Sequence, residues 1–273
     1  MTGIRREYDM KVAILYIAIG RYTIFWDEFY KSSEKYFLKN AQKHYFIFTD
    51  GQIPKGIDRT ILYQENLGWP LNTLLRYRMF MRIKNELKDY DYVYFFNANM
   101  EFISPVTEEN IIPKAENDYL IAALHPVNKK VKNPDDFEYD RNPACNAYVP
   151  KGQGKHYYQA AISGGAEKEY MDMVEELSRA TDKDLENNII AQWHDESHFN
   201  CYMAKRNPLV LDYNYMQSET GKPWIRLKPG VKIIQRDKSK YKYGGHAYLR
   251  GQSDEIISLP KFIMQKILPE EKK

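Results

Sequence analysis

Short apolar runs recur along the chain and alternate with segments of helical spacing. Residues 12–19 form a continuous apolar run that ends at Gly20. Such a run is typical of a strand that is buried on both faces of a mostly parallel sheet. The same pattern predicts further strands over residues 44–48, 60–62, 92–96, 119–124, 209–211 and 231–234.

The segments between these runs predict helices. Apolar residues recur at helical spacing over residues 23–38, and Pro70 suits the first turn of a long helix over residues 70–87. After residue 142 the chain becomes rich in loops, and we expect a glycine pair at 164–165 to interrupt it. Beyond that point the sequence predicts helices over residues 167–179, over residues 183–191 and from Asp195 onward.

This alternation predicts a single α/β domain with a Rossmann-like nucleotide-binding half and an acceptor-binding half. The 273 residues, 43% of them hydrophobic, suffice for one large core. We divide the chain into a polar leader (1–10), the main domain (11–252) and a C-terminal extension (253–273). Within the extension, residues 262–268 lie between two prolines and predict a short amphipathic helix that packs on the domain or docks on a membrane surface.

The charges of the chain are nearly balanced. The net charge of +3 arises from 40 basic and 37 acidic residues, which is not the basic excess of a nucleic-acid-binding protein. Basic residues nevertheless gather near the C-terminus, where they would either meet an anionic partner, such as a diphosphate, or form a solvated surface. They are Lys222, Arg226, Lys228, Lys232, Arg236, Lys238, Lys240 and Lys242.

The cysteines and the hydropathy of the chain indicate the cellular compartment of the protein. The two cysteines, Cys145 and Cys201, show no metal-ligand spacing, and we expect two free thiols of a reducing compartment rather than the alternative of a single disulfide. The run over residues 12–19 is far shorter than the roughly 20 residues of a spanning helix. We therefore expect a cytoplasmic protein, with a peripheral contact at the inner membrane as an extension of that hypothesis.

Two asparagines follow the apolar strand at 92–96. Ligands bind at strand ends of open α/β sheets, and Asn97 and Asn99 would share one face because strands alternate with period two. Aspartates at both positions would hold a divalent cation. Amides bind sugar or ribose hydroxyls but are poor ligands for Mg²⁺ or Mn²⁺. A simple strand-end turn is the structural alternative.

The segment WHDESHFN at residues 193–200 is the densest in candidate chemistry. Glu196 would stand beneath an anomeric carbon as a nucleophile or as the stabiliser of an oxocarbenium-like transition state. Asp195 would accept a sugar hydroxyl, and Trp193 would stack on a pyranose. His194 and His198 are four residues apart, which also permits the zinc pair of a hydrolase, although no third ligand is evident. A helix start with acidic residues favoured by the dipole is the structural alternative.

Further candidates are spread along the chain. The small residues of YYQAAISGG (157–165) would let a ligand approach the backbone. Tyr22 would stack on a base. Arg78 and Lys238 would balance a diphosphate, and His125 would bind an acceptor hydroxyl. Each of these has a structural explanation as well, and a non-catalytic carbohydrate-binding protein is a competing class.

The order of these motifs resembles glycosyltransferase family 6, which includes the histo-blood-group ABO transferases and the α-1,3-galactosyltransferase. The resemblance extends from about residue 11 to residue 252. Its most specific part is WHDESHFN. The other matching segments are YFIFTD (45–50), Arg78-Met79, NANMEF (97–102, where animal enzymes have DVDMEF), Leu124-His125-Pro126, FEYDRNPACNAYVP (137–150) and YYQAAISGG.

The resemblance implies a GT-A fold, a UDP-sugar donor, retention of anomeric configuration and an α-1,3 bond to a β-galactoside. It makes Glu196 the catalytic carboxylate. Carried over to this chain, it places Ile17, Ala18 and Tyr22 at the uridine, and Arg78 and Lys238 at the diphosphate and donor sugar. It places Asn97 and Asn99 at the metal-motif positions, Gln159, Ala160 and Ala161 at the donor-selecting positions, Asp195 at the donor hexose, and His125, Glu138 and Trp193 at the acceptor.

Two positions qualify what the resemblance implies. Bacterial members of the family carry NxN and work without metal, so we expect no cofactor and no metal site. Lys238 and its basic neighbours would supply the positive charge that a divalent cation provides in the enzymes with DxD. The methyl group of Ala161 would crowd a 2-acetamido group, which favours UDP-galactose over UDP-N-acetylgalactosamine as the donor. A fucosylated galactoside and a plain β-galactoside both remain open as the acceptor.

Overall fold

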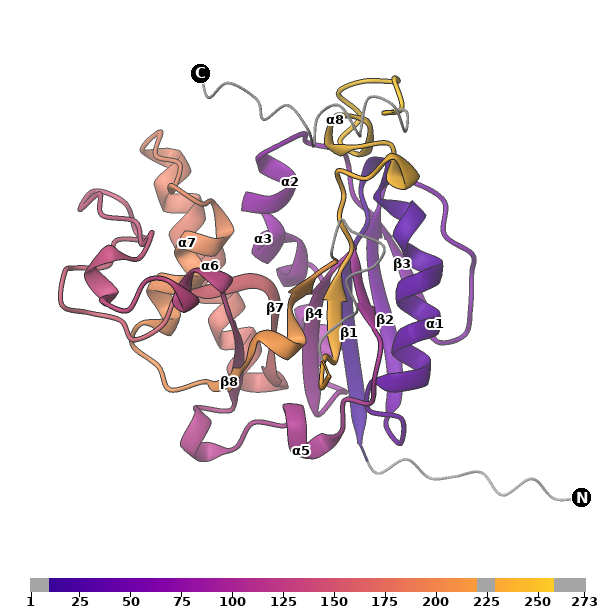
Figure 1. Cartoon of the computed structure of the whole chain (residues 1–273), viewed down its shortest axis with the longest axis horizontal. Coiled ribbons are helices and arrows are strands. Elements are labelled where there is room, and N and C mark those ends of the chain that lie inside the picture. The colour runs from indigo at the N-terminus through magenta and orange to yellow at the C-terminus, as the bar shows by residue number, and fades with distance from the viewer. Residues whose placement is uncertain (1–9, 220–228, 258–273) are drawn as a thin grey trace, which may run out of the picture.

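The computed structural model describes residues 10–219 and 229–257 of the chain. Its centre is a seven-stranded sheet of order β3-β2-β1-β4-β7-β6-β8 (Figure 1). Strands β1 to β4 run parallel, β7 runs antiparallel to β4 and β6, and β8 is parallel to β6. The strands are β1 (Lys11–Ile17), β2 (Gln42–Thr49), β3 (Arg59–Tyr63), β4 (Tyr92–Asn97), β6 (Leu120–Leu124), β7 (Tyr158–Ala166) and β8 (Leu209–Leu211).

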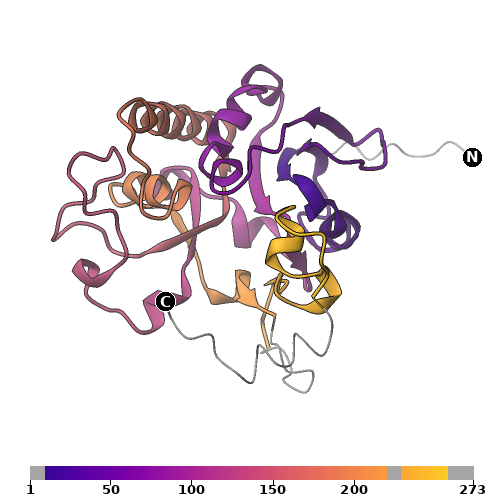
Figure 2. The ribbon, with the colours of Figure 1, turned by 90° about the horizontal axis from the view of Figure 1, so that it is seen from above.

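A small second sheet joins the middle of the chain to its C-terminal part. It consists of β5 (Met100–Phe102), β10 (Ile233–Gln235) and β9 (Gln217–Ser218), in that order. Because β10 pairs antiparallel with β5, the residues after β10 return to the turn that follows β4. Figures 1 and 2 show this yellow C-terminal segment beside the indigo N-terminal part of the chain.

Helices cover both faces of the central sheet. Alternate residues of β1 point to opposite faces: Tyr16 packs in one core with Phe29 of α1 (Trp26–Tyr36), and Leu15 packs in the other with Phe80 of α3 (Arg76–Met81) and Tyr170 of α6 (Glu167–Glu186). The predicted α/β class is confirmed. The remaining helices are α2 (Leu71–Leu74), α3 (Arg76–Met81), α4 (Lys84–Leu87), α5 (Glu108–Ile111), α6 (Glu167–Glu186), α7 (Asp195–Met203) and α8 (His246–Leu249).

Three sequence-based expectations about helices and strands are wrong. The predicted helix over 70–87 is three short helices, because the backbone leaves helical geometry at Leu75 and Ile83. The predicted helix over 183–191 is absent, since α6 continues to Glu186 and the chain then turns. The glycine pair at 164–165 lies inside β7, where a Cβ atom would collide with the Tyr94 ring or the Tyr119 carbonyl oxygen.

Other expectations concern cysteines and segments at the ends of the domain. Cys145 and Cys201 are both free thiols, as predicted. No helix among the described residues is long and apolar enough to cross a bilayer. The leader up to residue 9, the basic residues Lys222, Arg226 and Lys228, and the predicted helix at 262–268 lie outside the described residues.

Candidate active site

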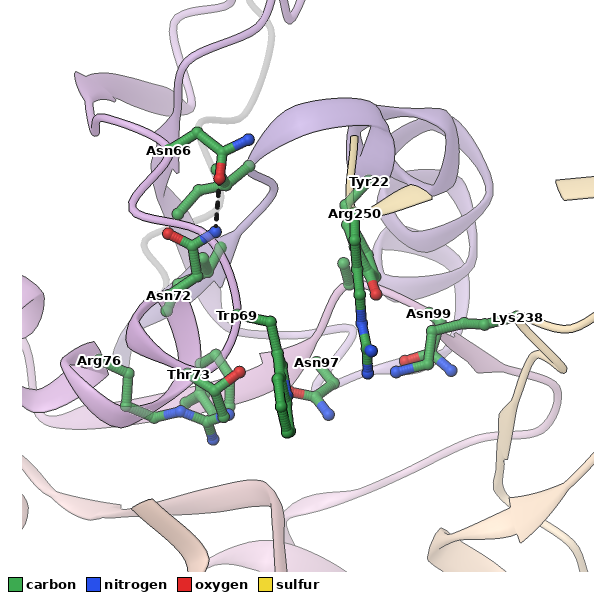
Figure 3. Close-up of a pocket in the computed structure, with 14 residues that line it drawn as sticks. Tyr22, Asn66, Trp69, Asn72, Thr73, Arg76, Asn97, Asn99, Lys238 and Arg250 are labelled. Atoms are coloured by element: carbon green, nitrogen blue, oxygen red, sulfur yellow. Dashed lines mark hydrogen bonds between the residues drawn. The ribbon is translucent and has the colours of Figure 1, made fainter. Parts of the chain in front are cut away.

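A cavity of about 250 Å³ opens where β1 and β4 end. Ile17, Phe95 and Asn97 contribute strand residues to its wall, and Tyr22 comes from the 3-10 helix after β1. Figure 3 shows side chains from four separate parts of the chain that point into this space. Lining residues that the sequence analysis did not single out are Ile19, Asn66, Trp69, Asn72, Thr73, Arg76, Phe95, Ala98 and Arg250.

Three cationic side chains face this cavity. Lys238 and Arg250 enter from the C-terminal segment and Arg76 enters from the start of α3. Burial, together with the charges of Arg250 and Arg76, lowers the pKa of Lys238 to about 8. Among the described residues that line the cavity none is acidic. A cavity of this charge attracts an anion such as a diphosphate.

The other described basic residues of this C-terminal segment are neutralised by carboxylates or engaged elsewhere. Arg236 pairs with Glu219 at 3.0 Å, Lys240 pairs with the same carboxylate at 2.9 Å, and Lys242 pairs with Glu28 at 2.9 Å. Lys232 donates to a backbone carbonyl at 2.6 Å. Of the predicted basic residues that the structure describes in this segment, therefore, only Lys238 faces the cavity, and Arg250 joins it.

The structure corrects the role expected of Arg78. Its side chain is 53% exposed, lies outside the cavity and pairs with Asp182 of α6. Arg76 lies two residues earlier, which is about 200° around a helix, so it points into the site instead. A signal was available in the sequence, because Arg76 is four residues before Phe80 on the buried side of the helix and Arg78 is not.

Two adjacent carboxylates at the start of α7 lie beside this cavity. The Asp195 carboxylate is 3.1 Å from Arg76 Nε, and both side chains are buried. Arg76 also donates to the Ala160 carbonyl at 2.6 Å, while the Ala160 amide donates to Glu196 Oε2 at 2.9 Å. Through Arg76 and one residue of β7, the cavity and both carboxylates form one connected site.

Burial raises the pKa of both carboxyls. For Glu196 the pKa rises to about 7; the Ala160 amide opposes this rise and the charge of Asp195 adds to it. For Asp195 the pKa rises to about 6, with Arg76 as the opposing charge. Carboxyls with pKa values this far from normal are characteristic of functional sites.

The sequence matches the profile of Glycosyltransferase family 6 over residues 3–243. The chain belongs to glycosyltransferase family 6. An Escherichia coli O-antigen biosynthesis glycosyltransferase, WbnI, is 32% identical over 87% of this chain and 99% of its own length. The human globoside alpha-1,3-N-acetylgalactosaminyltransferase 1 and the rat histo-blood group ABO system transferase 2 are each 27% identical, over 86% and 84% of this chain and 68% and 70% of their own lengths.

The two asparagines of this family 6 transferase lie differently at the end of β4. Asn97 is the last residue of the strand and lines the cavity. Asn99 also borders the cavity, but its amide nitrogen donates to the Arg236 carbonyl at 2.7 Å and its side chain is buried. The two side chains therefore do not form an equivalent pair.

The predicted donor-side residues surround the same strand ends. Ile17 and Tyr22 line the cavity, and Lys238 Nζ lies 5.7 Å from the Tyr22 ring centroid. Ala18 is buried between two lining residues and does not itself face the cavity. In β7, Ala161 is buried, and the adjacent pairing of Ile162 with Phe96 brings it to the end of β4. Gln159 is partly buried in the same strand.

Two of the predicted acceptor-side residues, His125 and Glu138, lie near Tyr157. The His125 ring meets the Tyr157 ring edge-on at 5.5 Å, and burial raises the Tyr157 pKa, with the charges of Glu196 and Glu138 adding to the rise. Trp193 is 44% exposed, one helical turn before the Ser197 hydroxyl that accepts from its backbone amide. These side chains therefore lie on the Glu196 side of the site and are not among the residues that line the cationic cavity.

The histidines of the hypothetical zinc pair have separate surroundings. His194 precedes α7 with a φ of 56° and packs edge-on against Trp69 at 5.2 Å. His198 is buried with its Nε2 3.4 Å from Asp184. Within the described ranges no three His, Cys, Asp or Glu side chains form a metal cluster. The helical spacing that suggested a pair does not apply, because His194 is not in the helix.

Proposed function

We propose that this family 6 member is a retaining transferase that moves a hexose from a UDP-sugar to a galactoside in α-1,3 linkage, without a metal ion. One observation carries the proposal. Lys238, Arg250 and Arg76 face a cavity whose described lining has no carboxylate, at the strand end where the family motif reads Asn97-Ala98-Asn99. The human relative named above is an alpha-1,3-transferase, which supports the linkage.

In the proposed reaction, separate groups of residues bind the base, the diphosphate and the sugar. Tyr22 and Ile17 hold the base, and Lys238 and Arg250 bind the diphosphate and neutralise the charge that develops on it when its bond to the sugar breaks. Asp195, fixed by Arg76, holds the hexose. The ionised Glu196 stabilises positive charge at the anomeric carbon while the acceptor oxygen forms the new bond and its proton passes to the departing diphosphate.

A donor-by-acceptor screen in the presence of EDTA tests this function. We expect sugar transfer from UDP-galactose or UDP-N-acetylgalactosamine to a β-galactoside or a fucosylated galactoside, at the same rate with and without the chelator. Loss of transfer in EDTA that Mn²⁺ restores would contradict metal independence. A chain that binds UDP and galactosides but transfers nothing would instead be a carbohydrate-binding protein.

We propose UDP-galactose as the preferred donor. Ala161 of β7 is buried beside the end of β4, and its methyl group leaves less room for an acetamido group than glycine would. The N-acetylgalactosaminyltransferase among the relatives supports the alternative donor. We expect Ala161→Gly to shift the ratio of kcat/KM values towards UDP-N-acetylgalactosamine by about tenfold or more. Ala122→Gly, a buried alanine of β6, is the control and keeps the wild-type ratio.

The pH dependence of kcat/KM for the donor is set by the ionisation of two side chains, Glu196 and Lys238. Glu196 acts as an anion, so activity falls as the pH drops below its pKa of about 7. Lys238 acts as a cation, so activity falls as the pH rises above its pKa of about 8. We expect a bell-shaped profile between these values, and Lys238→Arg extends the alkaline limb because arginine stays charged. An unchanged alkaline limb in Lys238→Arg would remove Lys238 from this role.

A further inference from the structure

The segment that carries Lys238 is fixed in place by Asn99. Arg236, two residues before Lys238, donates its backbone amide to the Asn99 carbonyl at 2.8 Å. Its carbonyl in turn accepts from the Asn99 side-chain amide at 2.7 Å. Asn99 is 2% exposed, so the amide cannot exchange this partner for bulk water without cost. One asparagine therefore holds Arg236 through both of its backbone polar groups.

The same segment is held from its other side by carboxylates. The Arg236 guanidinium contacts Glu101 and lies 3.0 Å from Glu219 Oε1. Glu219 Oε2 also accepts from the Asp237 backbone amide at 3.1 Å, and Glu219 pairs with Lys240 at 2.9 Å. We call Asn99, Glu101, Glu219 and Arg236 the Lys238 clamp. It fixes the residues on both sides of Lys238.

We propose that Asn99 is a positioning residue that acts through Lys238, whereas Asn97 is the asparagine that contacts the donor. This inference rests on the proposed function. The clamp requires an N–H donor at residue 99, which a carboxylate lacks. Aspartate there would face the Arg236 carbonyl and stand near Glu101 and Glu219, so it would repel the segment that presents the cation. A lysine-dependent site thus requires an amide at this position.

A double-mutant cycle on UDP binding tests the proposal. Calorimetry gives the Kd for UDP of the wild type, Asn99→Ala, Lys238→Ala and the double variant. We expect each single change to raise Kd by about tenfold, as the loss of a contact to a charged group does. The double variant should bind UDP no more weakly than Lys238→Ala alone. Asn99 acts only through the position of the Lys238 amine, and Lys238→Ala has already removed that amine.

The control is a buried asparagine of the same kind elsewhere in the fold. Asn128 donates its side-chain amide to the His125 and Tyr157 carbonyls at 2.7 and 2.6 Å. Asn128→Ala should lower the melting temperature and leave the Kd for UDP unchanged. If Asn99→Ala does not fold, Glu219→Gln weakens the clamp from its other side and is expected to show the same dependence on Lys238.

Two results overturn the positioning role. In the first, the factors by which Asn99→Ala and Lys238→Ala raise the Kd for UDP multiply in the double variant. In the second, Asn99→Ala and Glu219→Gln bind UDP with the Kd of the wild type. Failure of the proposed function is seen in the wild type instead. Wild-type protein that binds UDP but transfers no sugar refutes the transferase proposal and leaves the clamp measurable. Wild-type protein without affinity for UDP refutes both.

Discussion

Replacing Glu196 with glutamine is expected to lower kcat by a factor on the order of 10³ and to leave the Kd for UDP nearly unchanged. Glutamine has the size of glutamate, and its carbonyl oxygen can still accept the Ala160 amide that now contacts Glu196 Oε2 at 2.9 Å. The substitution removes the negative charge and little else. Single-turnover kinetics and calorimetry with UDP separate the two effects.

The loss should be confined to the chemical step, because Glu196 lies on α7 and not among the residues that line the cationic cavity. Glu176→Gln removes the same charge from an exposed position on α6 and serves as the control, with wild-type kcat expected. Near-normal turnover by Glu196→Gln would refute its catalytic role, and a large rise in the Kd for UDP would assign it to donor binding.

Replacing Arg76 with methionine is expected to reduce the free energy of unfolding by about 3–5 kcal/mol at neutral pH. The Arg76 and Asp195 side chains are 8% and 3% exposed, and the change leaves the Asp195 charge buried without its partner. It also removes the donor to the Ala160 carbonyl. Urea denaturation measures the loss.

The double variant Arg76→Met with Asp195→Asn should recover part of this stability, because no uncompensated charge remains. The matched control is Arg78→Met in the same helix. Its ion pair with Asp182 is largely exposed, and surface pairs contribute no more than about 1 kcal/mol. Equal losses in Arg76→Met and Arg78→Met would mean that the buried pair does not hold this site together.

Strands were easier to predict than helices in this chain. Each apolar run that predicted a strand has one in the structure. The central strands β1 and β4 gave the strongest signal, because a strand buried between two helical layers needs apolar residues on both faces. The region from residue 142 was expected to be loop-rich and to be interrupted at Gly164 and Gly165, but both glycines lie inside β7, where the lack of a Cβ atom lets Tyr94 and Tyr119 approach closely. Helix limits at Leu75, Ile83 and Glu186 depend on packing and were missed.

In the candidate site, too, residues in a local motif could be predicted, and residues brought in by distant segments could not. The motif WHDESHFN pointed to Asp195 and Glu196. These two carboxylates are brought together by the start of a single helix, with no contribution from a distant segment. Arg250 gave no local signal, since it reaches the cavity only because α8 packs on the 3-10 helix after β1. The basic residues near the C-terminus looked equivalent until their carboxylate partners were known.

The sequence by itself determined the α/β class, the family and the two carboxylates at the start of α7, because each depends on residues that are adjacent in the chain. The tertiary structure alone decided that Arg76 and not Arg78 faces the site, that Lys238 and Arg250 remain directed into the cavity, and that Asn99 fastens Arg236. These outcomes depend on contacts between segments that are distant in sequence, and the burial and charge of such contacts are not encoded by any local pattern.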